Sequence, residues 1–256
     1  MGVILARVVR ASRWLAQLVH PHRCLLCRGA LPVGTPAMLC PGCARRVRQE
    51  YRNTEMITIP GAAGADAPLL YVGQLANAMK RYKFYRSTAL SRWFSAQGAA
   101  CLASHLDEWQ PDCLTYVPLG LICWWPRGFN QSEVLARQIG KALHLPVCAA
   151  LGKRPRIGKQ SRRTARERWK AARNMFFPLP GGAVRGKRVV LIDDIITTGA
   201  SAADGVRALR KAGAAEVFVL APLSTPWDAH KYREPLNKSP NASSRHKLPV
   251  DGVRKP

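Results

Sequence analysis

The stretch Val189-Val-Leu-Ile-Asp-Asp-Ile-Ile-Thr-Thr-Gly-Ala-Ser201 decides the fold class. Residues 189–192 are four consecutive apolar residues, three of them β-branched, and they predict a buried strand of a parallel sheet. Residues 202–209 carry apolar side chains at helical spacing, and residues 217–220 predict the next buried strand. A strand, a helix and a strand joined by short connections form a βαβ unit. We therefore expect an α/β protein built on a parallel sheet.

The turn inside this stretch has the composition of a phosphate-binding loop. In parallel α/β sheets, ligands bind beyond the carboxyl ends of the strands, where this turn must lie. A helix N-terminus, backbone N–H groups and hydroxyls can together hold a phosphate, and Gly199 lets the backbone approach it closely. The loop that we expect to do this consists of Thr197, Thr198, Gly199, Ala200 and Ser201.

Two adjacent carboxylates, Asp193 and Asp194, stand next to that loop. Ionised carboxylates only accept hydrogen bonds, which suits the hydroxyls of a sugar or a hydrated cation. A phosphate-binding loop beside paired carboxylates therefore indicates a ribose 5-phosphate site. The alternative interpretation is a pair of strand-end aspartates that only caps the following helix.

A cysteine cluster near the N-terminus indicates a metal site. Cys24 and Cys27 are separated by two residues, twelve residues follow, and Cys40 and Cys43 repeat the spacing. Two such pairs can place four thiolates in a tetrahedron around Zn²⁺, and four protein ligands leave no open position, so we expect a structural zinc. A redox dithiol and a metal-free ribbon are the alternatives. The remaining cysteines have no ligand spacing and are expected to be buried or incidental thiols.

The charge of the chain is strongly positive. The 256 residues include 40 Lys and Arg against 15 Asp and Glu, a net charge of +25. Such a field attracts nucleic acid, anionic lipid or multiply phosphorylated small molecules, although a generally basic proteome would also explain it. The 47% hydrophobic content is enough for an ordinary core, and the lack of an uninterrupted run of about 18 apolar residues argues against a membrane-spanning helix.

The N-terminus bears on localisation. Its apolar stretch is interrupted by Arg7, Arg10 and Arg13, so it lacks the hydrophobic region of a signal peptide. We therefore expect a cytoplasmic protein with reduced thiols. Residues 1–20 predict a basic amphipathic helix, which packs on its own protein or lies on a membrane surface.

The sequence divides into five parts. We expect an amphipathic helix at 1–20, a zinc ribbon at 21–45, a linker at 46–68, the α/β domain at 69–224 and a disordered basic tail at 225–256. Within the α/β domain, strands are expected at 69–72 and 114–119, and a helix at 80–94. Asn130 and Glu133 have the spacing of a capping box and predict the start of another helix.

The strand followed by Asp-Asp-x-x-Thr-Thr-Gly resembles the signature of type I phosphoribosyltransferases. More specifically, the chain resembles the ComF family of competence and DNA-utilisation proteins, which join a cysteine zinc ribbon to a phosphoribosyltransferase domain. Three further segments match that family: Tyr116-Val-Pro-Leu-Gly, Arg127-Gly-Phe-Asn-Gln131 and Arg-Asn-Met-Phe at 173–176. The resemblance covers roughly residues 21–223.

The resemblance implies a binding site for phosphoribosyl pyrophosphate (PRPP) with magnesium. Asp193 and Asp194 would hold the ribose hydroxyls, and residues 197–201 the 5′-phosphate. The turn up to Arg127 would form the pyrophosphate side, which Lys83 would also reach. Mg²⁺ would bridge pyrophosphate and ribose oxygens. The family further implies a role in DNA uptake or utilisation, with the uptake machinery as a partner.

Other functions stay open at this point. Residues 153–173 hold ten Lys and Arg and one acidic residue, so the chain is alternatively a single-stranded-DNA-binding accessory protein whose sugar-phosphate pocket is regulatory or vestigial. A nucleobase salvage phosphoribosyltransferase is the third candidate. Thr197 stands where 6-oxopurine phosphoribosyltransferases have an aspartate, which argues against that form of salvage. The sequence assigns no catalytic residue.

Overall fold

The computed structural model describes most of the chain, namely residues 22–32, 37–85, 87–120, 128–155, 174–181 and 183–226. The helix expected at 1–20, most of the expected tail, Arg127 and most of the basic stretch 153–173 lie outside these residues. Within them, every helix is too short or too polar to cross a membrane.

The centre of the protein is a four-stranded parallel sheet. Its strands lie in the order β1 (Gly64–Asp66), β8 (Glu216–Leu220), β6 (Arg188–Ile192) and β3 (Cys113–Tyr116). In the pairing register, Val190 of β6 stands between Leu114 of β3 and Phe218 of β8. The expected α/β class with a parallel sheet is confirmed.

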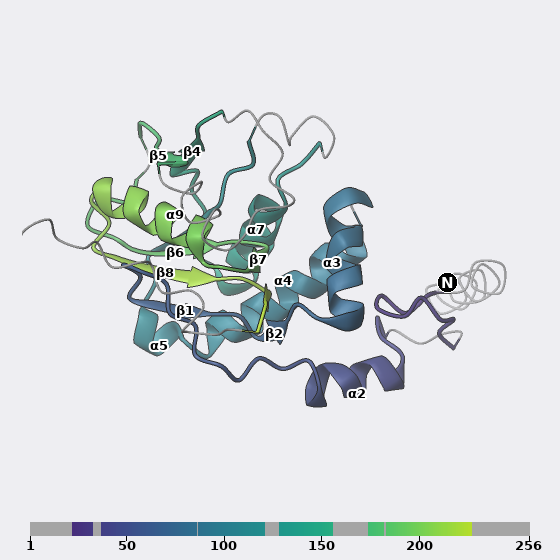
Figure 1. The fold of residues 1–256 in the computed structure, drawn as a ribbon. Coiled ribbons are helices and arrows are strands. Elements are labelled where there is room, and N and C mark those ends of the chain that lie inside the picture. Colours follow the sequence, from purple (N-terminus) through teal and green to yellow (C-terminus); the bar gives the residue numbers. More distant parts are fainter. Residues whose placement is uncertain are drawn as a thin grey trace, which may run out of the picture.

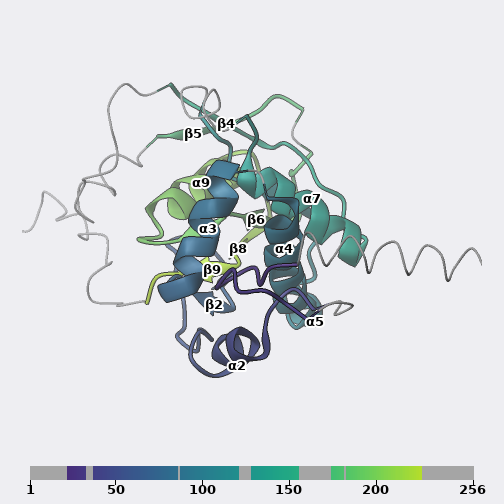
Figure 2. The same ribbon diagram turned by 90° about the vertical axis from the view of Figure 1, so that its right-hand side faces the viewer.

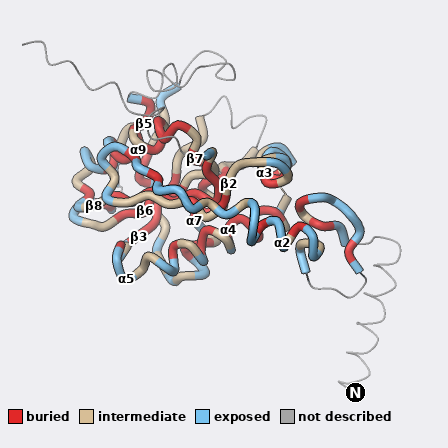
Figure 3. Tube along the Cα trace, turned by 60° about the horizontal axis from the view of Figure 1, so that its bottom comes forward, coloured by how far each residue is buried: buried red, intermediate tan, exposed pale blue. Residues whose placement is uncertain are grey.

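Helices cover both faces of this sheet (Figures 1 and 2). One face carries α9 (Ala200–Lys211), and the other carries α3 (Gly73–Tyr85), α4 (Thr88–Ala103), α5 (Leu106–Trp109) and α7 (Gln131–Leu143). Side chains of β6 alternate between these layers: Val190 and Ile192 pack with α3, α4 and α7, whereas Val189 and Leu191 pack with α9. Because both faces are buried (Figure 3), the four residues that follow Arg188 in β6 are all apolar.

Two smaller sheets complete the fold. β2 (Leu69–Leu70), β9 (Leu223–Ser224) and β7 (Ile195–Ile196) form a parallel sheet directly after the ends of the central strands. β4 (Leu151–Lys153) and β5 (Phe176–Pro178) form an antiparallel pair beside α9. The basic stretch joins β4 to β5.

The structure differs from the sequence expectation over residues 46–68. Helix α2 (Pro41–Gln49) crosses the expected boundary between ribbon and linker, and β1 lies within the expected linker. β1 is an edge strand that pairs with β8. A Cβ atom at Gly64 would lie 3.2 Å from the Trp109 ring nitrogen, so a small residue is needed where the indole covers the strand.

Boundaries inside the α/β domain also shift. The helix expected at 80–94 is two helices, because α3 ends at Tyr85 and the side chain of Ser87 accepts a hydrogen bond from the Leu90 amide at 3.3 Å to start α4. The strands expected at 69–72 and 114–119 are the shorter β2 and β3. The expected helix start at Asn130 is confirmed, since Asn130 Oδ1 accepts from the Ser132 and Glu133 amides, whereas the Glu133 carboxylate accepts from Arg137.

Candidate functional site

The paired carboxylates stand at the point where the chain leaves the central sheet. β6 ends at Ile192, and the Asp193 amide still donates to the Leu220 carbonyl of β8 at 3.0 Å. The chain then forms β7 and turns into α9. Asp193 and Asp194 thus lie at the carboxyl edge of the sheet, where parallel α/β folds bind their ligands.

Asp193 is held by two donors from different elements. Its Oδ1 accepts from Ser132 Oγ, in the first turn of α7, at 3.2 Å and from the Asp194 amide at 2.7 Å. Burial, and secondly the neighbouring charge of Asp194, raise the pKa of the Asp193 carboxyl to about 7, although the hydrogen bonds and Lys83 act in the opposite direction. This carboxylate is therefore an unfavourable charge in the free protein, and a hydroxyl or cation bound to it would relieve the repulsion.

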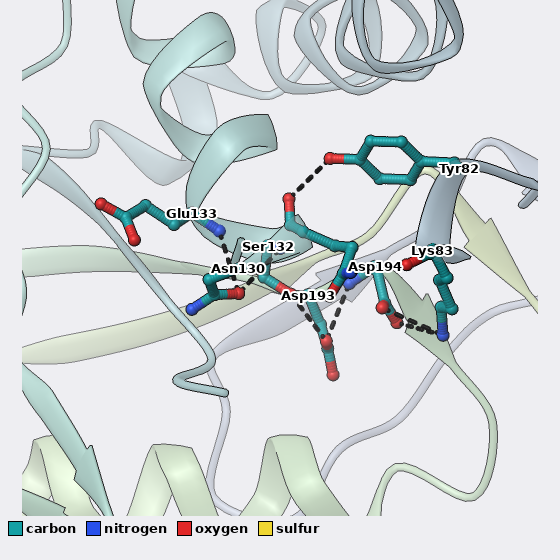
Figure 4. A network of polar contacts seen from close by, with 8 residues as sticks. Tyr82, Lys83, Asn130, Ser132, Glu133, Asp193 and Asp194 are labelled. Atoms are coloured by element: carbon teal, nitrogen blue, oxygen red, sulfur yellow. Dashed lines mark hydrogen bonds and ion pairs between the residues drawn. The ribbon is translucent and has the colours of Figure 1, made fainter. Parts of the chain in front are cut away.

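Asp194 forms an ion pair with a residue far away in the sequence. Lys83 Nζ, from the last turn of α3, lies 3.0 Å from both carboxylate oxygens of Asp194. α3 is tied to α7 at the same point: Tyr82 Oη donates to the Gln131 carbonyl at 2.9 Å, and Gln131 Nε2 donates to the Lys83 carbonyl at 3.1 Å. Figure 4 shows this network, which places three elements around the two aspartates.

The expected phosphate-binding loop lies between β7 and α9. Gly199 is the N-cap of α9 with φ of +69°, a left-handed conformation that favours glycine. A glycine has no side chain with which to cap the helix, so the first-turn amides of α9 remain oriented toward the loop. Thr225, next to β9, anchors the start of the loop, because its Oγ1 donates to the Thr197 carbonyl at 3.0 Å.

Individual residues of the loop differ in exposure. Thr198, Gly199 and Ala200 are buried, whereas Thr197 and Ser201 are partly exposed. Thr198 Oγ1 accepts from the Ala200 amide at 3.4 Å, so this hydroxyl orders the loop. The two partly exposed hydroxyls and the helix N-terminus are the groups that an anion would meet.

A second helix N-terminus lies at the same edge of the sheet. Asn130 caps α7 and also donates, through Nδ2, to the Val117 carbonyl just after β3 at 3.1 Å. The first turn of α7 therefore lies next to Asp193, and its dipole favours negative charge there. Arg127, expected on this side, lies outside the described residues.

The four expected zinc ligands come together. The Sγ atoms of Cys24, Cys27, Cys40 and Cys43 all lie within 4.8 Å of one another, and those of Cys27 and Cys40 are 3.8 Å apart. Zn–S bonds of about 2.3 Å in a tetrahedron place sulfur atoms roughly 3.8 Å apart. Amide N–H groups point at three of the sulfurs, as in Gly29 to Cys27 at 3.4 Å.

Two thiols of the cluster have altered acidities: the pKa of Cys43 is raised, by burial and by hydrogen bonds with the neighbouring thiols, and that of Cys24 is lowered. Burial raises the pKa of Cys24, but hydrogen bonds from the Cys40, Cys27 and Leu26 amides outweigh it and lower the pKa to about 6. A thiolate is the form that ligates metal, so the cluster has the geometry and the donors of a zinc ribbon.

The cysteine module is not a separate body. Cys24, Leu26, Leu31, Cys43 and Val47 belong to the same hydrophobic cluster as α3, α4 and α7. Cys43 Sγ donates to Gln74 Oε1 of α3 at 3.3 Å, and the Arg81 guanidinium of α3 donates to the Leu25 carbonyl. Helix α3 thus contacts the cysteine cluster through Gln74 in its first turn and Asp194 through Lys83 in its last turn. Figure 1 shows the helix between the central sheet and the N-terminal module.

Sequence reasoning missed several residues of these sites. Tyr82 and Gln131 join α3 to α7, and Ser132 holds Asp193, but the sequence assigned none of them a role, although Gln131 ends one of the segments that match the family. A third group of donor atoms, from Asp66, Cys101 and His105, also escaped notice. A Cys-x-x-x-His spacing at 101–105 was the available signal, since residues four apart share a helix face.

Comparisons with known proteins gave the following similarities. Residues 128–245 match the family model described as phosphoribosyl transferase domain. Competence protein F of Haemophilus influenzae is 25% identical over 77% of this chain and 94% of its own. DNA utilization protein YhgH of Salmonella typhimurium is 30% identical over 79% of this chain and 96% of its own. The solved glutamine phosphoribosylpyrophosphate amidotransferase of B. subtilis covers 56% of this chain and 30% of its own, with 24% identity and a TM-score of 0.39.

Fold, site and family model define the central domain as a phosphoribosyltransferase domain. It is joined to a four-cysteine module, as the resemblance implied. The chain belongs to the ComF family of competence and DNA-utilisation proteins.

Proposed function

We propose that this protein binds Mg²⁺-PRPP at the carboxyl edge of its sheet. The observation that carries the proposal is the juxtaposition of the strained Asp193 and Asp194 pair with the glycine-capped N-terminus of α9. Hydroxyl acceptors beside an anion-binding helix end fit a ribose 5-phosphate better than either a free anion or a free sugar. The family relationship supports the same ligand.

Each part of the ligand has a candidate partner. The 5′-phosphate would lie on residues 197–201, and the ribose hydroxyls would donate to Asp193 and Asp194. Lys83 would supply positive charge near the pyrophosphate, assisted by the N-terminus of α7. Arg127 keeps its expected role on the same side.

Magnesium fits the donors that the site offers. Two adjacent carboxylates present oxygen atoms only, and Mg²⁺ prefers oxygen ligands, often with several retained waters. When bound, Mg²⁺ neutralises the charge of a pyrophosphate leaving group. The contribution of the chain is to position the ribose and to aim helix dipoles at the phosphates.

Calorimetric titration tests this proposal. PRPP added to the full chain should bind one per chain when Mg²⁺ is present and much more weakly when it is absent. Ribose 5-phosphate should bind without Mg²⁺, because it lacks the pyrophosphate. No heat of binding at millimolar PRPP would contradict the proposal. A screen of nucleobases for pyrophosphate release then decides between a binding protein, a salvage enzyme and another phosphoribosyltransferase.

Single-stranded DNA is a second candidate ligand, and it would fit a role in DNA uptake or utilisation like the one that the relatives' names indicate. The observation that favours it is a pair of exposed aromatic residues, Phe84 and Tyr85, directly after Lys83 in a chain of net charge +25. Exposed rings and positive charge are the two features by which proteins hold single strands without sequence preference. The expected cytoplasmic location would give the protein access to such a strand.

Salt dependence and ring removal test the DNA candidate. The logarithm of the affinity for an oligonucleotide should fall with the logarithm of salt by roughly 0.7 per phosphate neutralised. Replacing Phe84 and Tyr85 by alanine should weaken binding about tenfold or more, because each stacked base contributes roughly 1–3 kcal/mol. Met56→Ala, which removes another exposed apolar side chain, is the matched control. A flat salt response, or equal losses in both variants, would contradict this function.

A further inference from the structure

A second group of candidate metal-binding donors lies at the edge strand β1, which β8 separates from β6 and the phosphoribosyltransferase signature. Asp66 ends the edge strand β1, Cys101 lies in the last turn of α4, and His105 follows that helix. The amide of His105 donates to the Leu102 carbonyl at 3.0 Å, which continues the helical turn and keeps Cys101 and His105 on one face. One carboxylate oxygen of Asp66 is hydrogen-bonded to both side chains, to Cys101 Sγ at 3.3 Å and to His105 Nε2 at 2.8 Å.

The histidine is held rigidly in this position. Its ring stacks on Trp109 with centroids 4.3 Å apart and planes 8° apart, and Trp109 stacks in turn on Phe218 of β8 at 4.9 Å. The other ring nitrogen, Nδ1, lies 3.7 Å from a carboxylate oxygen of Glu108. Metal-binding histidines characteristically have a carboxylate behind the ring, which fixes its orientation and makes the ligating nitrogen more basic.

The spacing of the donors is close to that of a metal site. The sulfur, nitrogen and oxygen atoms all lie within 4.8 Å of one another. Tetrahedral zinc, with bonds of about 2.0–2.3 Å, holds such donors about 3.3–3.6 Å apart. The imidazole and the carboxylate would therefore separate by about half an ångström to admit the ion, a change that side-chain rotation accomplishes.

The electrostatics of the cluster also fit a cation. In the structure the Cys101 thiol donates to the Asp66 carboxylate at 3.3 Å. A divalent ion would replace that proton and balance one thiolate and one carboxylate.

We propose that Asp66, Cys101 and His105 form a three-ligand zinc site that ties the edge strand β1 to the end of α4. The mixed sulfur, nitrogen and oxygen set is typical of Zn²⁺, and a water would complete the tetrahedron. This zinc site is independent of the proposed PRPP site, because the end of strand β8 lies between them. On one side, the Ala221 amide donates to the Asp66 carbonyl, and on the other, the Asp193 amide donates to the Leu220 carbonyl.

Zinc content of matched variants tests the proposal. The full chain, dialysed against buffered micromolar Zn²⁺, should hold one zinc ion more than either Cys101→Ser or His105→Phe. Phenylalanine keeps the stack on Trp109 and removes only the ligating nitrogen. Cys148→Ser, which alters a partly buried thiol outside both clusters, should keep the wild-type zinc content. Equal zinc content in the wild type and in both site variants would overturn the proposal. The three side chains would then only form hydrogen bonds at the end of α4.

A measurement on the unaltered chain guards against variants that fail to fold. Cadmium NMR of the Cd²⁺-loaded wild type should show a resonance from a site with a single thiolate, well upfield of any signal from the four-cysteine cluster. Its disappearance in Cys101→Ser, with the four-thiolate signal unchanged, would assign it to this site. A spectrum of the wild type without the upfield resonance would contradict the proposal.

Discussion

Cys43→Ser is expected to destabilise the whole chain and to remove one zinc ion. Cys43 is 3% exposed, belongs to the cluster that includes α3 and α4, and donates to Gln74. Losing a structural metal is among the few changes that cost more than about 4 kcal/mol of unfolding free energy. Since a chain of this size loses about 2–4 °C per kcal/mol, the melting temperature should fall by roughly 8–16 °C.

Cys148→Ser provides the control for this prediction. It also replaces a thiol by a hydroxyl at a partly buried position, but Cys148 lies outside the metal clusters. Thermal unfolding followed by circular dichroism, with zinc measured on the same samples, should leave this control close to the wild type. If Cys43→Ser melted with the control and kept its zinc, the cysteine module would be a metal-free ribbon.

Patterns that act over short distances predicted the largest part of the fold. The apolar run at 189–192, the helix after Gly199 and the cap at Asn130 depend on neighbours in the sequence, and the structure contains all three. The cysteine spacing also succeeded, because two residues between thiols nearly fix the local geometry. Between residues this close in the sequence, the backbone can adopt few conformations that satisfy the pattern.

Contacts over long distances explain what could not be predicted. The sequence predicts a linker where β1 lies, because these three residues form a strand only by pairing with β8, more than 150 residues later. The ion pair of Lys83 with Asp194 joins residues 111 positions apart, and Asp66 meets Cys101 over 35. A single sequence contains no signal for such pairs. A family resemblance pointed to Lys83, whereas Asp66 was found only in the structure.

The contacts around Asp193 and Asp194 leave the charge of the Asp193 carboxylate unfavourable in the free protein. Lys83 neutralises Asp194, whereas in the described part of the chain the Asp193 carboxylate accepts hydrogen bonds from a hydroxyl and an amide. A site preorganised for a ligand commonly carries such strain, which the ligand then relieves. Asp193 should therefore affect stability and binding in opposite directions.

Asp193→Asn is expected to raise stability and to weaken PRPP binding. The folded-state pKa of about 7 lies above the ordinary value of 3.8, so between these values the folded chain keeps a proton that the unfolded chain has lost. The contribution of Asp193 to the free energy of unfolding is therefore largest below about pH 4 and declines until the pH passes about 7. Asparagine resembles the protonated form of aspartate at every pH, so the variant does not lose this contribution to the free energy of unfolding as the pH rises. The variant should melt several degrees above the wild type at pH 8 and close to it at pH 4.

Binding should change the other way in the same variant. Losing a charged acceptor for a ribose hydroxyl costs about 1.5–3 kcal/mol, which corresponds to about a 10- to 150-fold weaker affinity for Mg²⁺-PRPP. Asp107→Asn, which neutralises an exposed carboxylate on α5, should leave both melting and affinity unchanged. Unaltered affinity in Asp193→Asn would remove this residue from the ribose site. A melting temperature at pH 8 no higher than that of the wild type would show that its carboxylate is not an unfavourable charge. Because the two readings are separate, a misfolded variant cannot imitate the expected pair of results: higher stability together with weaker binding.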